Sequence, residues 1–500
     1  MGKEVASAKN IQKGTRVLFF AACFIFCFVF FSEIHPLVIF DTDDWCYISQ
    51  HRVALPQINA WNPTRVFPEV LMPAIAGFAH WAIEPFVGSF VTAQIIAHAV
   101  IASVFITFYL ALLEIMLEKT FSLSRFSAIC LTVLFFAFHF LALRIWQIGN
   151  GYFFWSVDVT AFYYYVLSNL LCASIVLYAA RTGIISNFFN NKDLKRKSIF
   201  VAGLYFALFS NLFASIIVAS FATVSVIEDL LKERKQKHLN LYVLVKRNGL
   251  SILIIITWLV IQVMEANGGR SESLSSDFNF LDQLKAGITL LADIEFNRTF
   301  SLIVLGSYLL FFCLLIKEKG AHSLASKSIV ACLICGIISL FYVILICTKA
   351  GLGYLTRPDV LFGSFFFICV GSIISLTEAF RKYKKLVLIL PLVVLMVVNQ
   401  INTTGQTFKN TNSWGVSNEI AISVTEDIIG QIKTESSKGA ETMQLRIPKS
   451  DTEDNWPLAI YGGFYYSNSL LEFGIIDKEI NIEIIPDSKK NIELGLSADR

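Results

Sequence analysis

Residues 40–69 are the stretch around which the rest of the chain is organised. They read FDTDDWCYISQHRVALPQINAWNPTRVFPE. Three carboxylates, Asp41, Asp43 and Asp44, lie within four positions and are followed directly by Trp45. The stretch comes just after the first strongly apolar run. Charge this dense beside a bilayer is costly unless it is solvated, paired or used for function. The acidic segment is therefore the first candidate for chemistry.

The composition is that of a polytopic membrane protein. Of the 500 residues, 55% are hydrophobic, 14% aromatic and only 16% charged, whereas soluble domains average about a quarter charged residues. The net charge of +3 gives no indication of a nucleic-acid partner. The partner that the composition does predict is a lipid bilayer.

Cysteine and histidine give no sign of a disulfide framework or a metal site. All ten cysteines except Cys46 fall inside apolar runs. Cys332 and Cys335 form a C-x-x-C pair within a helix-length apolar segment, where packing thiols are favoured over a redox or metal site. The histidines near the acidic segment lack metal-ligand spacing. A divalent ion on the aspartates stays possible but is not predicted, because hard cations usually take more oxygen ligands than two. The cofactor is thus unknown.

Clusters of lysine and arginine predict the topology. Residues 1–16 carry four basic side chains before an apolar run, which we interpret as an uncleaved signal anchor with a cytoplasmic N-terminus. A segment at 66–84, interrupted by Pro68 and Pro73, is predicted to lie at the membrane interface. The predicted spans are 16–34, 87–115, 126–143, 160–180, 248–264, 299–316, 328–347, 360–376 and 386–399.

The apolar run 199–227 does not fit a single span, because it has basic residues on both flanks. One helix cannot have both ends in the cytoplasm. We predict a hairpin of two short helices, broken near Ser210 and Asn211; the alternative is a single span with one basic loop exported. With the hairpin counted as two, the bundle has about eleven helices, and every basic cluster is cytoplasmic.

Residues 401–500 are polar and predict a second domain outside the membrane. Ser417–Lys433 has the pattern of an amphipathic helix, while 443–447 and 480–485 alternate like short strands. The predicted fold is therefore an all-α polytopic membrane bundle at 1–400, followed by a small periplasmic α/β domain at 401–500.

The ionisable side chains of interest gather in the predicted outside loops. A carboxylate can accept a proton from a sugar hydroxyl. An arginine or lysine can hold a leaving phosphate and stabilise its charge, and aromatic rings suit stacking on sugar faces. The candidate site residues are Asp41, Asp43, Asp44, Trp45, Arg65, Glu69, Arg144, Asp158, Lys349, Tyr354 and Arg357.

Several candidates also have a purely structural interpretation. The aspartates can be helix-end charges in water. Arg65 can pair with Glu69, four residues later on a short helix. Asp158 can cap the next span. Arg357, before Pro358 at a helix start, can snorkel to the interface.

The plan of the chain resembles the GT-C superfamily of polytopic glycosyltransferases. Those proteins have a cytoplasmic N-terminus, a first span and an acidic motif in the first outside loop, to which Asp41, Asp43 and Asp44 in FDTDDW correspond. The interfacial helix, the mid-chain hairpin and the outside C-terminal domain are similar too. The plan is most similar to bacterial O-antigen glucosyltransferases of serotype conversion, which use a bactoprenol-phosphate sugar. No WWDYG-like stretch is present, which departs from oligosaccharyltransferases.

The resemblance implies a membrane glycosyltransferase of the bacterial inner membrane. It would move a sugar, glucose in those relatives, from a polyprenyl-phosphate donor to a surface glycan such as lipopolysaccharide O-antigen on the periplasmic face. It implies that Asp43 or Asp44 is the base on the acceptor hydroxyl and that Arg357 binds phosphate. Arg65 and Lys349 would help to hold that phosphate.

Glu69 and Asp158 would position groups or orient the arginines of such a site. The sequence leaves two other functions open, and a structural membrane scaffold without activity is a third option. One is an O-antigen polymerase or ligase, which typically relies on a large late loop, whereas here 349–359 is short. The other is a flippase or transporter of a lipid-linked sugar or polysaccharide, which would need polar residues at mid-membrane depth.

Overall fold

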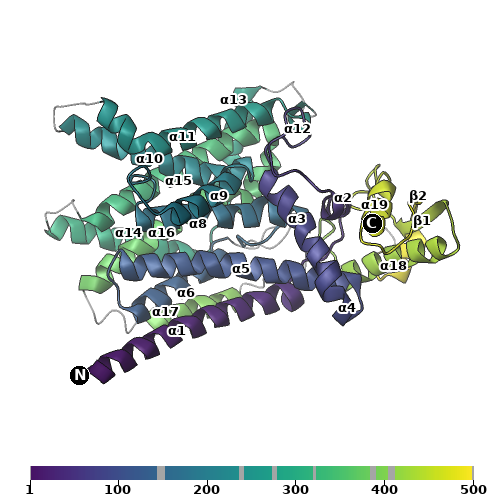
Figure 1. Ribbon diagram of the computed structural model, residues 1–500, viewed down its shortest axis with the longest axis horizontal. Helices are drawn as coiled ribbons and strands as arrows, with labels where there is room; N and C mark the ends of the chain where they lie inside the picture. Colours follow the sequence, from purple (N-terminus) through teal and green to yellow (C-terminus); the bar gives the residue numbers. More distant parts are fainter. Residues whose placement is uncertain are drawn as a thin grey trace.

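Apolar helices build most of the chain (Figure 1). The structure is a computed structural model that describes residues 2–143, 152–235, 241–272, 279–318, 323–382, 390–403 and 412–497. The long helices are α1 (Gly2–Val29), α5 (Phe90–Lys119), α6 (Arg125–Leu141), α8 (Ser168–Thr182), α9 (Leu194–Leu208), α10 (Leu212–Lys235), α11 (Leu241–Ala266), α14 (Arg298–Glu318), α15 (Leu324–Ala350), α16 (Pro358–Lys382) and α17 (Leu390–Thr403).

Shorter helical pieces connect and extend these long helices. Three of them, η1, η2 and η3, are π-helical turns, and η4 is a 3-10 helix. The pieces are η1 (Phe30–Ile34), α2 (Thr42–Ser49), α3 (Val66–Phe78), η2 (Ala79–Ile83), α4 (Glu84–Val87), α7 (Val159–Ala161), η3 (Phe162–Leu167), α12 (Gly269–Glu272), α13 (Phe280–Ala292) and η4 (Leu352–Thr356).

The prediction of a helical, multi-pass membrane bundle is confirmed. Within the described residues, nine helices are long and apolar enough to cross a membrane. Each predicted span has a counterpart among the long helices, although α6, α9 and α17 are too short to be counted among the nine. The start of the last predicted span, 386–389, lies outside the described residues.

One of the nine helices is the segment Val66–Val87, which the sequence predicted to be interfacial. It comprises α3, η2 and α4, and Figure 1 shows it crossing the end of α5 at a steep angle instead of running alongside it. Trp81 and Phe86 are 78% and 88% exposed at its far end. This orientation suits a helix that lies at a membrane surface.

The break that was predicted near Ser210 and Asn211 is confirmed. Helix α9 ends at Leu208, and α10 begins at Leu212. Asn211 closes the turn, since its side-chain oxygen accepts the N–H of Phe213 at 2.8 Å. The prediction that both helices are short is wrong for the second, because the apolar pattern of α10 continues for 24 residues, long enough to cross a membrane.

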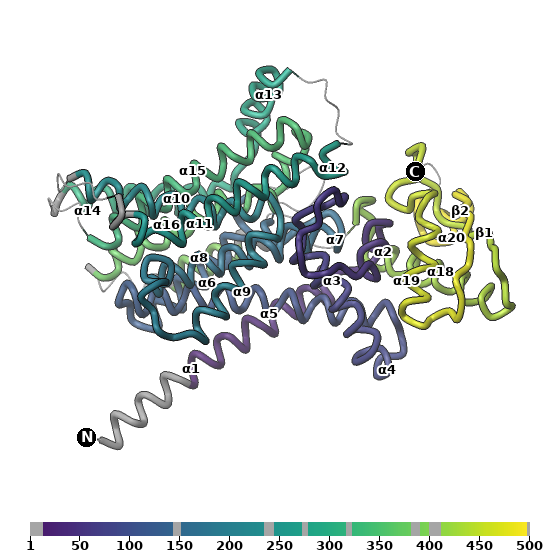
Figure 2. The backbone as a smooth tube through the Cα atoms, turned by 45° about the horizontal axis from the view of Figure 1, so that its top comes forward, coloured from purple at the N-terminus to yellow at the C-terminus, as the bar shows by residue number. Residues whose placement is uncertain are grey.

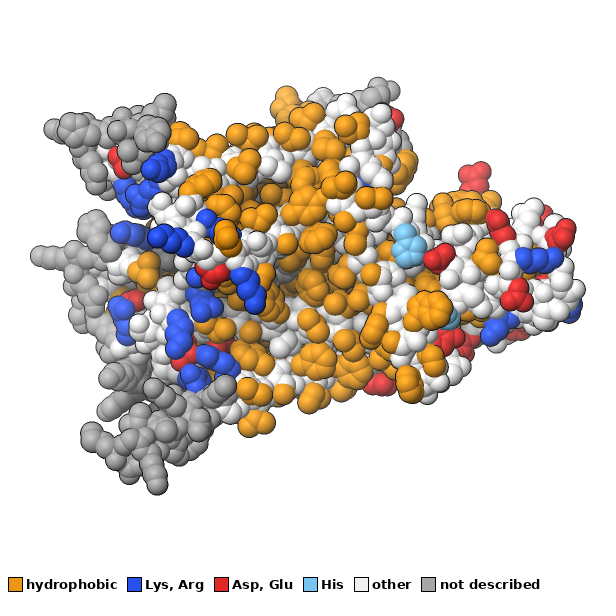
Figure 3. Space-filling model, viewed as in Figure 1, with side chains coloured by type: hydrophobic (Ala, Val, Ile, Leu, Met, Phe, Trp, Pro, Cys, Tyr) orange, Lys and Arg blue, Asp and Glu red, His pale blue; other side chains and the backbone are white. Residues whose placement is uncertain are grey.

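Charge is segregated along the bundle (Figure 3). Figure 3 shows lysine and arginine gathered at one end, an apolar band across the middle, and acidic and basic residues mixed on the C-terminal segment at the other end. Exposed apolar side chains occur on α11, α14 and α15, among them Leu259, Leu305 and Ile337. A wide apolar belt between two charged ends is what a bilayer requires.

The C-terminal segment 412–497 contains helices and two strands. They are α18 (Asn418–Ser437), β1 (Thr442–Pro448), α19 (Gly463–Glu472), β2 (Asn481–Asp487) and α20 (Ser488–Glu493). The strands pair in parallel, from Thr442 opposite Asn481 to Pro448 opposite Asp487. The amphipathic helix and both strands therefore form where they were predicted.

Helix α2 lies between the bundle and the C-terminal segment, as both Figure 1 and Figure 2 show. Helix α19 packs on it, with Trp45 against Tyr466 in an edge-to-face arrangement at 5.2 Å between ring centroids. Buried side chains of the bundle and of this segment belong to one continuous cluster. The acidic stretch is thus held from both sides.

Candidate active site

The start of α2 separates the three aspartates. Asp41 is the N-cap residue, and Asp44 is the third residue of the helix. Asp44 is fully buried, and one of its oxygens accepts the N–H groups of Phe40 and Asp41 at 3.1 and 3.3 Å. Its other oxygen accepts the N–H and the hydroxyl of Thr160 at 2.7 and 2.9 Å. Asp44 therefore joins the starts of two helices.

Asp43 instead faces a cavity of about 510 Å³ at this end of the bundle. Helix α2, the loop before α7, the π-turn η3, the helices α12 and η4, and the C-terminal segment all contribute to its wall. The lining residues are Asp43, Tyr47, Trp61, Arg65, Val157, Asp158, Thr160, Ala161, Tyr164, Tyr165, Arg270, Tyr354, Arg357, Ser413 and Trp456.

Three arginines and four tyrosines line the cavity. The guanidinium carbon of Arg65 lies 4.9 Å from the ring centre of Tyr164. That of Arg357 lies 4.4 Å from the ring of Tyr165 and 5.4 Å from the ring of Tyr354. Cations over aromatic faces are held in a fixed orientation by the ring quadrupole. These side chains come from four distant parts of the sequence.

Arg357 is further fixed by a buried carboxylate. Its Nε and Nη2 donate to the two oxygens of Asp359 at 3.1 and 2.6 Å, and the Ser156 hydroxyl donates to Asp359 at 3.0 Å. Burial works to lower the pKa of Arg357, but Asp359 and Tyr165 outweigh it and hold that pKa above its ordinary value. Arg357 is therefore a permanent cation at the cavity wall.

Arg270 reaches the cavity from α12, and its Nη2 donates to the hydroxyl of Tyr354 at 3.0 Å. Arg65 precedes α3 and makes no ion pair among the residues that the structure describes. Burial raises the pKa of Asp43 above its ordinary value, although Arg270 and Arg65 lower it in part. Asp43 is thus more basic than a solvated carboxylate, while the two cations favour its ionised form.

The carboxyls of Asp44 and Asp158 are buried beside Asp43 and close to one another. Burial raises the pKa of Asp44 to about 6, against the lowering effect of the hydrogen bonds from Phe40 and Thr160. Burial, with the neighbouring Asp44 charge, also raises the pKa of Asp158 well above its ordinary range. Asp158 is the N-cap of α7, because one oxygen accepts the N–H of Ala161 at 2.5 Å. The capping interpretation of Asp158 is therefore confirmed, although it also lines the cavity.

Asp41 lies behind this group, outside the cavity lining. Burial and the charges of Asp158 and Asp44 raise the pKa of Asp41 well above its ordinary range. One of its oxygens accepts a short hydrogen bond from the hydroxyl of Ser413. Burial and the repulsion between like charges thus both favour the protonated forms of these carboxyls.

Glu69 does not pair with Arg65, which was the structural alternative for both. It pairs with Arg52, whose Nη1 lies 2.5 Å from one carboxylate oxygen. The other oxygen accepts from Asn62 Nδ2 at 2.9 Å and from the Tyr164 hydroxyl at 2.7 Å. Glu69 therefore orients Tyr164, and through that ring it positions Arg65.

Two further predicted site residues lie away from the cavity. Trp45 is fully buried between Phe90 and Tyr466 and packs the core under α2. Lys349 donates to the hydroxyl of Ser271 at 2.7 Å in an exposed position. Arg144 lies outside the described residues. Of the predicted candidates, those that line the cavity are Asp43, Arg65, Asp158, Tyr354 and Arg357.

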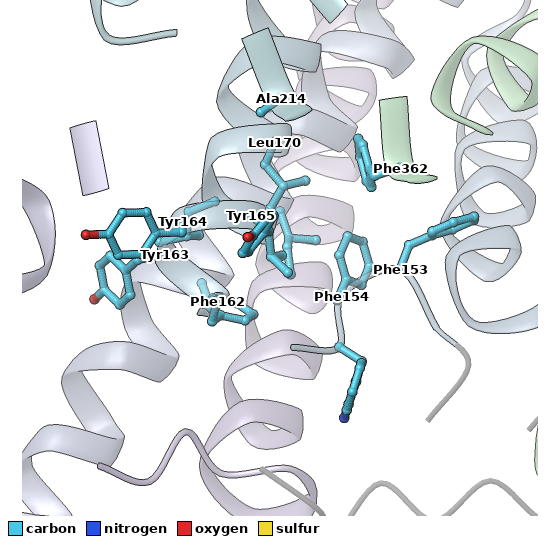
Figure 4. Close-up of a cluster of buried hydrophobic side chains, with 14 of the residues drawn as sticks. Phe153, Phe154, Phe162, Tyr163, Tyr164, Tyr165, Leu170, Ala214 and Phe362 are labelled. Atoms are coloured by element: carbon cyan, nitrogen blue, oxygen red, sulfur yellow. The ribbon is translucent and has the colours of Figure 1, made fainter. Parts of the chain in front are cut away.

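Sequence reasoning missed several lining residues. Arg270 lies in a predicted outside loop, and its charge there was the only signal for it. Tyr164 and Tyr165 belong to an apolar run and look like core residues. In Figure 4, the hydroxyls of Tyr163 and Tyr164 point away from the buried rings of Phe153 and Phe154. Tyr164 and Tyr165 both belong to the π-turn η3, and such turns are often found at functional sites.

The arrangement can bind an anion and accept a proton. Three guanidiniums and the phenol groups suit a phosphate, and Asp43 offers a basic oxygen beside them. Within the described residues, no group of three or more acidic, histidine or cysteine side chains could hold a metal ion. The chain matches no family model, no curated protein and no solved structure.

Proposed function

We propose that this protein is a membrane glycosyltransferase that moves a sugar from a polyprenyl-phosphate donor to the hydroxyl of a surface glycan. The observation that carries the proposal is the cavity in which Asp43 shares a wall with Arg65, Arg270 and Arg357. Its volume of about 510 Å³ falls in the range of small-molecule sites. Glucose as the sugar, O-antigen as the acceptor and the periplasmic face as the location are part of this proposal.

Asp43 serves as the general base. Its carboxylate takes the proton from the acceptor hydroxyl, and the hydroxyl oxygen forms a bond to the anomeric carbon of the donor sugar. The bond between that carbon and the phosphate oxygen breaks, and the phosphate leaves with the electron pair. The raised pKa of Asp43 supports this role, because a more basic carboxylate drives proton transfer better.

The leaving phosphate is held by Arg357, Arg270 and Arg65. Asp359 and the ring of Tyr165 fix the Arg357 guanidinium before any ligand arrives. Charged donors already in place cost little reorganisation when negative charge develops on the leaving group. Three arginines against two lining carboxyls, those of Asp43 and Asp158, leave the lining with an excess of positive charge for an anionic donor.

The apolar surroundings of the cavity suit a lipid-linked donor. Helix α13 packs beside η4, where a Cβ at Gly287 would meet Leu355 and Leu352. Its other face exposes Leu281 and Ile288, which are 70% and 54% exposed. An amphipathic helix of this kind lies comfortably at a membrane interface, and a polyprenyl chain can approach η4 along it.

The test is sugar transfer by the full chain in lipid nanodiscs. Undecaprenyl-phosphate [14C]glucose is the donor, and delipidated O-polysaccharide is the acceptor. Asp43→Asn should lower the transfer rate at least about a hundredfold, the usual contribution of a general base. Asp477→Asn, on an exposed carboxylate of the C-terminal segment, is the matched control and should behave as wild type.

The alternatives predict different outcomes of the same experiment. A flippase in liposomes moves the lipid-linked sugar between leaflets without consuming it. A polymerase or ligase leaves the monosaccharide donor untouched and consumes a lipid-linked oligosaccharide instead. Full activity of Asp43→Asn would refute the assigned base. The absence of transfer by wild-type protein from any polyprenyl-phosphate sugar would refute the proposed function.

A further inference from the structure

Trp456 is the aromatic side chain that the C-terminal segment contributes to the cavity, on the turn between β1 and α19. It is half-buried, whereas the bundle-side rings Tyr164 and Tyr165 are buried. Among the described residues, the indole N–H of Trp456 has no hydrogen-bond acceptor. An accessible ring with an unused donor is therefore presented to the same space as Asp43.

The turn that carries Trp456 is rigid. Asn455 is 2% exposed, and its amide oxygen accepts the N–H of Ser450 at 2.7 Å. Its amide nitrogen donates to the carbonyls of Pro448 and Leu458 at 3.1 and 2.8 Å. Asn455 has a φ of 59°, a left-handed conformation that asparagine tolerates better than most residues. The backbone that carries the ring is thus held in place by buried hydrogen bonds before a ligand binds.

The same turn is fastened to the helix that carries Asp43. The N–H and the hydroxyl of Thr42 both donate to the carbonyl of Pro457, at 2.9 and 2.8 Å. The hydroxyl of Thr42 also accepts the N–H of Ala459 at 2.8 Å. Thr42 and Asp43 are neighbours in α2. These hydrogen bonds therefore attach the turn that carries Trp456 directly beside the proposed base.

The two substrates of the proposed reaction reach the cavity from different directions. A polyprenyl tail must remain in the apolar band, which lies over the bundle (Figure 3). The C-terminal segment lies beyond that band, next to α2 (Figures 1 and 2). Its surface carries both acidic and basic side chains (Figure 3), and Tyr461 is exposed on it. A water-soluble saccharide is therefore the substrate that this side meets.

We propose that Trp456 is the acceptor-binding platform, on which a sugar ring of the glycan stacks so that its hydroxyl reaches Asp43. The inference rests on the proposed transferase function and assigns acceptor recognition to the C-terminal segment. Pyranose rings present a face of C–H groups that packs on an indole, and the indole N–H can donate to a ring hydroxyl. Trp456 binds the acceptor and takes no part in the bond changes.

The experiment compares Trp456→Ala, Trp456→Phe and the control Phe464→Ala in the nanodisc assay. Phe464 is 61% exposed on the same segment and does not line the cavity. Trp456→Ala should raise the acceptor KM about tenfold, with the donor KM and the slow transfer of glucose to water unchanged. Trp456→Phe should recover most of the acceptor affinity, and Phe464→Ala should match wild type.

Each outcome decides between the two proposals. An acceptor KM that stays within about twofold of wild type in an active Trp456→Ala enzyme refutes the platform and leaves the transferase intact. An equal rise in the donor KM also refutes the platform, because Trp456 would then affect the binding of both substrates. If the Ala variant does not fold, Trp456→Phe is compared with Trp456→Leu. The platform predicts a lower acceptor KM for the Phe variant, and equal acceptor KM values would refute it. A wild-type protein without transfer refutes both proposals.

Discussion

Thr42 and Pro457 are joined by two hydrogen bonds, both accepted by the same carbonyl oxygen, at 2.9 Å from the Thr42 N–H and 2.8 Å from its hydroxyl. Thr42 is the first residue of α2, and Pro457 belongs to the C-terminal segment. The contact therefore ties the acidic helix to residues from the other end of the chain. It explains how a segment beyond the bundle comes to share a wall with Asp43.

We predict that Thr42→Val loosens this junction. Valine keeps the shape of threonine but removes the hydroxyl that serves Pro457 and Ala459, leaving a buried N–H unsatisfied at a cost of about 1–3 kcal/mol. Hydrogen exchange should show faster exchange of the Ala459 amide and across α2. Thr42→Ser, which keeps the hydroxyl, is the control. Unchanged protection in the valine variant would mean that the junction does not depend on this bond.

Asp359 should act as a positioning residue for Arg357. In Asp359→Asn the paired carboxylate is lost, and an amide cannot accept from both guanidinium nitrogens. We expect the donor KM to rise about tenfold, with the acceptor KM little changed. Ser156→Ala removes a weaker support of the same carboxylate and should have a smaller effect in the same direction. An unaltered donor KM in Asp359→Asn would remove Arg357 from the phosphate site.

The pH dependence of transfer should report Asp43. The base works only when ionised, and burial raises its pKa, so activity should fall on the acid side at a higher pH than for a solvated aspartate. Arg65 lowers that pKa. Arg65→Gln should therefore move the acid limb of the kcat profile to higher pH, whereas Arg65→Lys should move it less. A shift to lower pH would contradict the assignment.

The buried pair of Arg52 and Glu69 offers a test of stability. Removing one partner of a buried pair leaves an uncompensated charge and typically costs about 3–5 kcal/mol. Arg52→Met should lower Tm strongly, and the double variant Arg52→Met with Glu69→Leu should recover part of the loss. The thermal unfolding of single and double variants in detergent measures the coupling. Additive losses would show that the two side chains do not stabilise each other.

Much of the fold could be predicted from local sequence. Apolar runs of helix length predicted the spans, and the polar pair at Ser210 and Asn211 predicted the break between α9 and α10. The sequence underestimates the length of α10, because the predicted hairpin places two short helices within the apolar run 199–227. A helix can continue into water as long as its backbone bonds are satisfied, and α10 extends to Lys235.

The candidate site could be predicted only in outline. Sequence alone could not separate Asp43 from Asp44, since adjacent residues on a helix differ by about 100° in direction. Packing of α2 against Thr160 turned Asp44 inward and left Asp43 at the cavity. The predicted Arg65–Glu69 pair is wrong for a similar reason, because Glu69 forms its ion pair with Arg52, which comes from the loop after α2. Such partners depend on how loops converge.

What the sequence by itself determined is the membrane bundle, its mid-chain break and the gathering of charge at its ends, because these follow from hydrophobic periodicity and the cost of burying charge. What only the tertiary structure decided is which charges meet. Arg270, Arg357 and Trp456 come from separate stretches of the chain and join Asp43 in one cavity. Contacts between distant residues depend on packing in three dimensions, which no local pattern records.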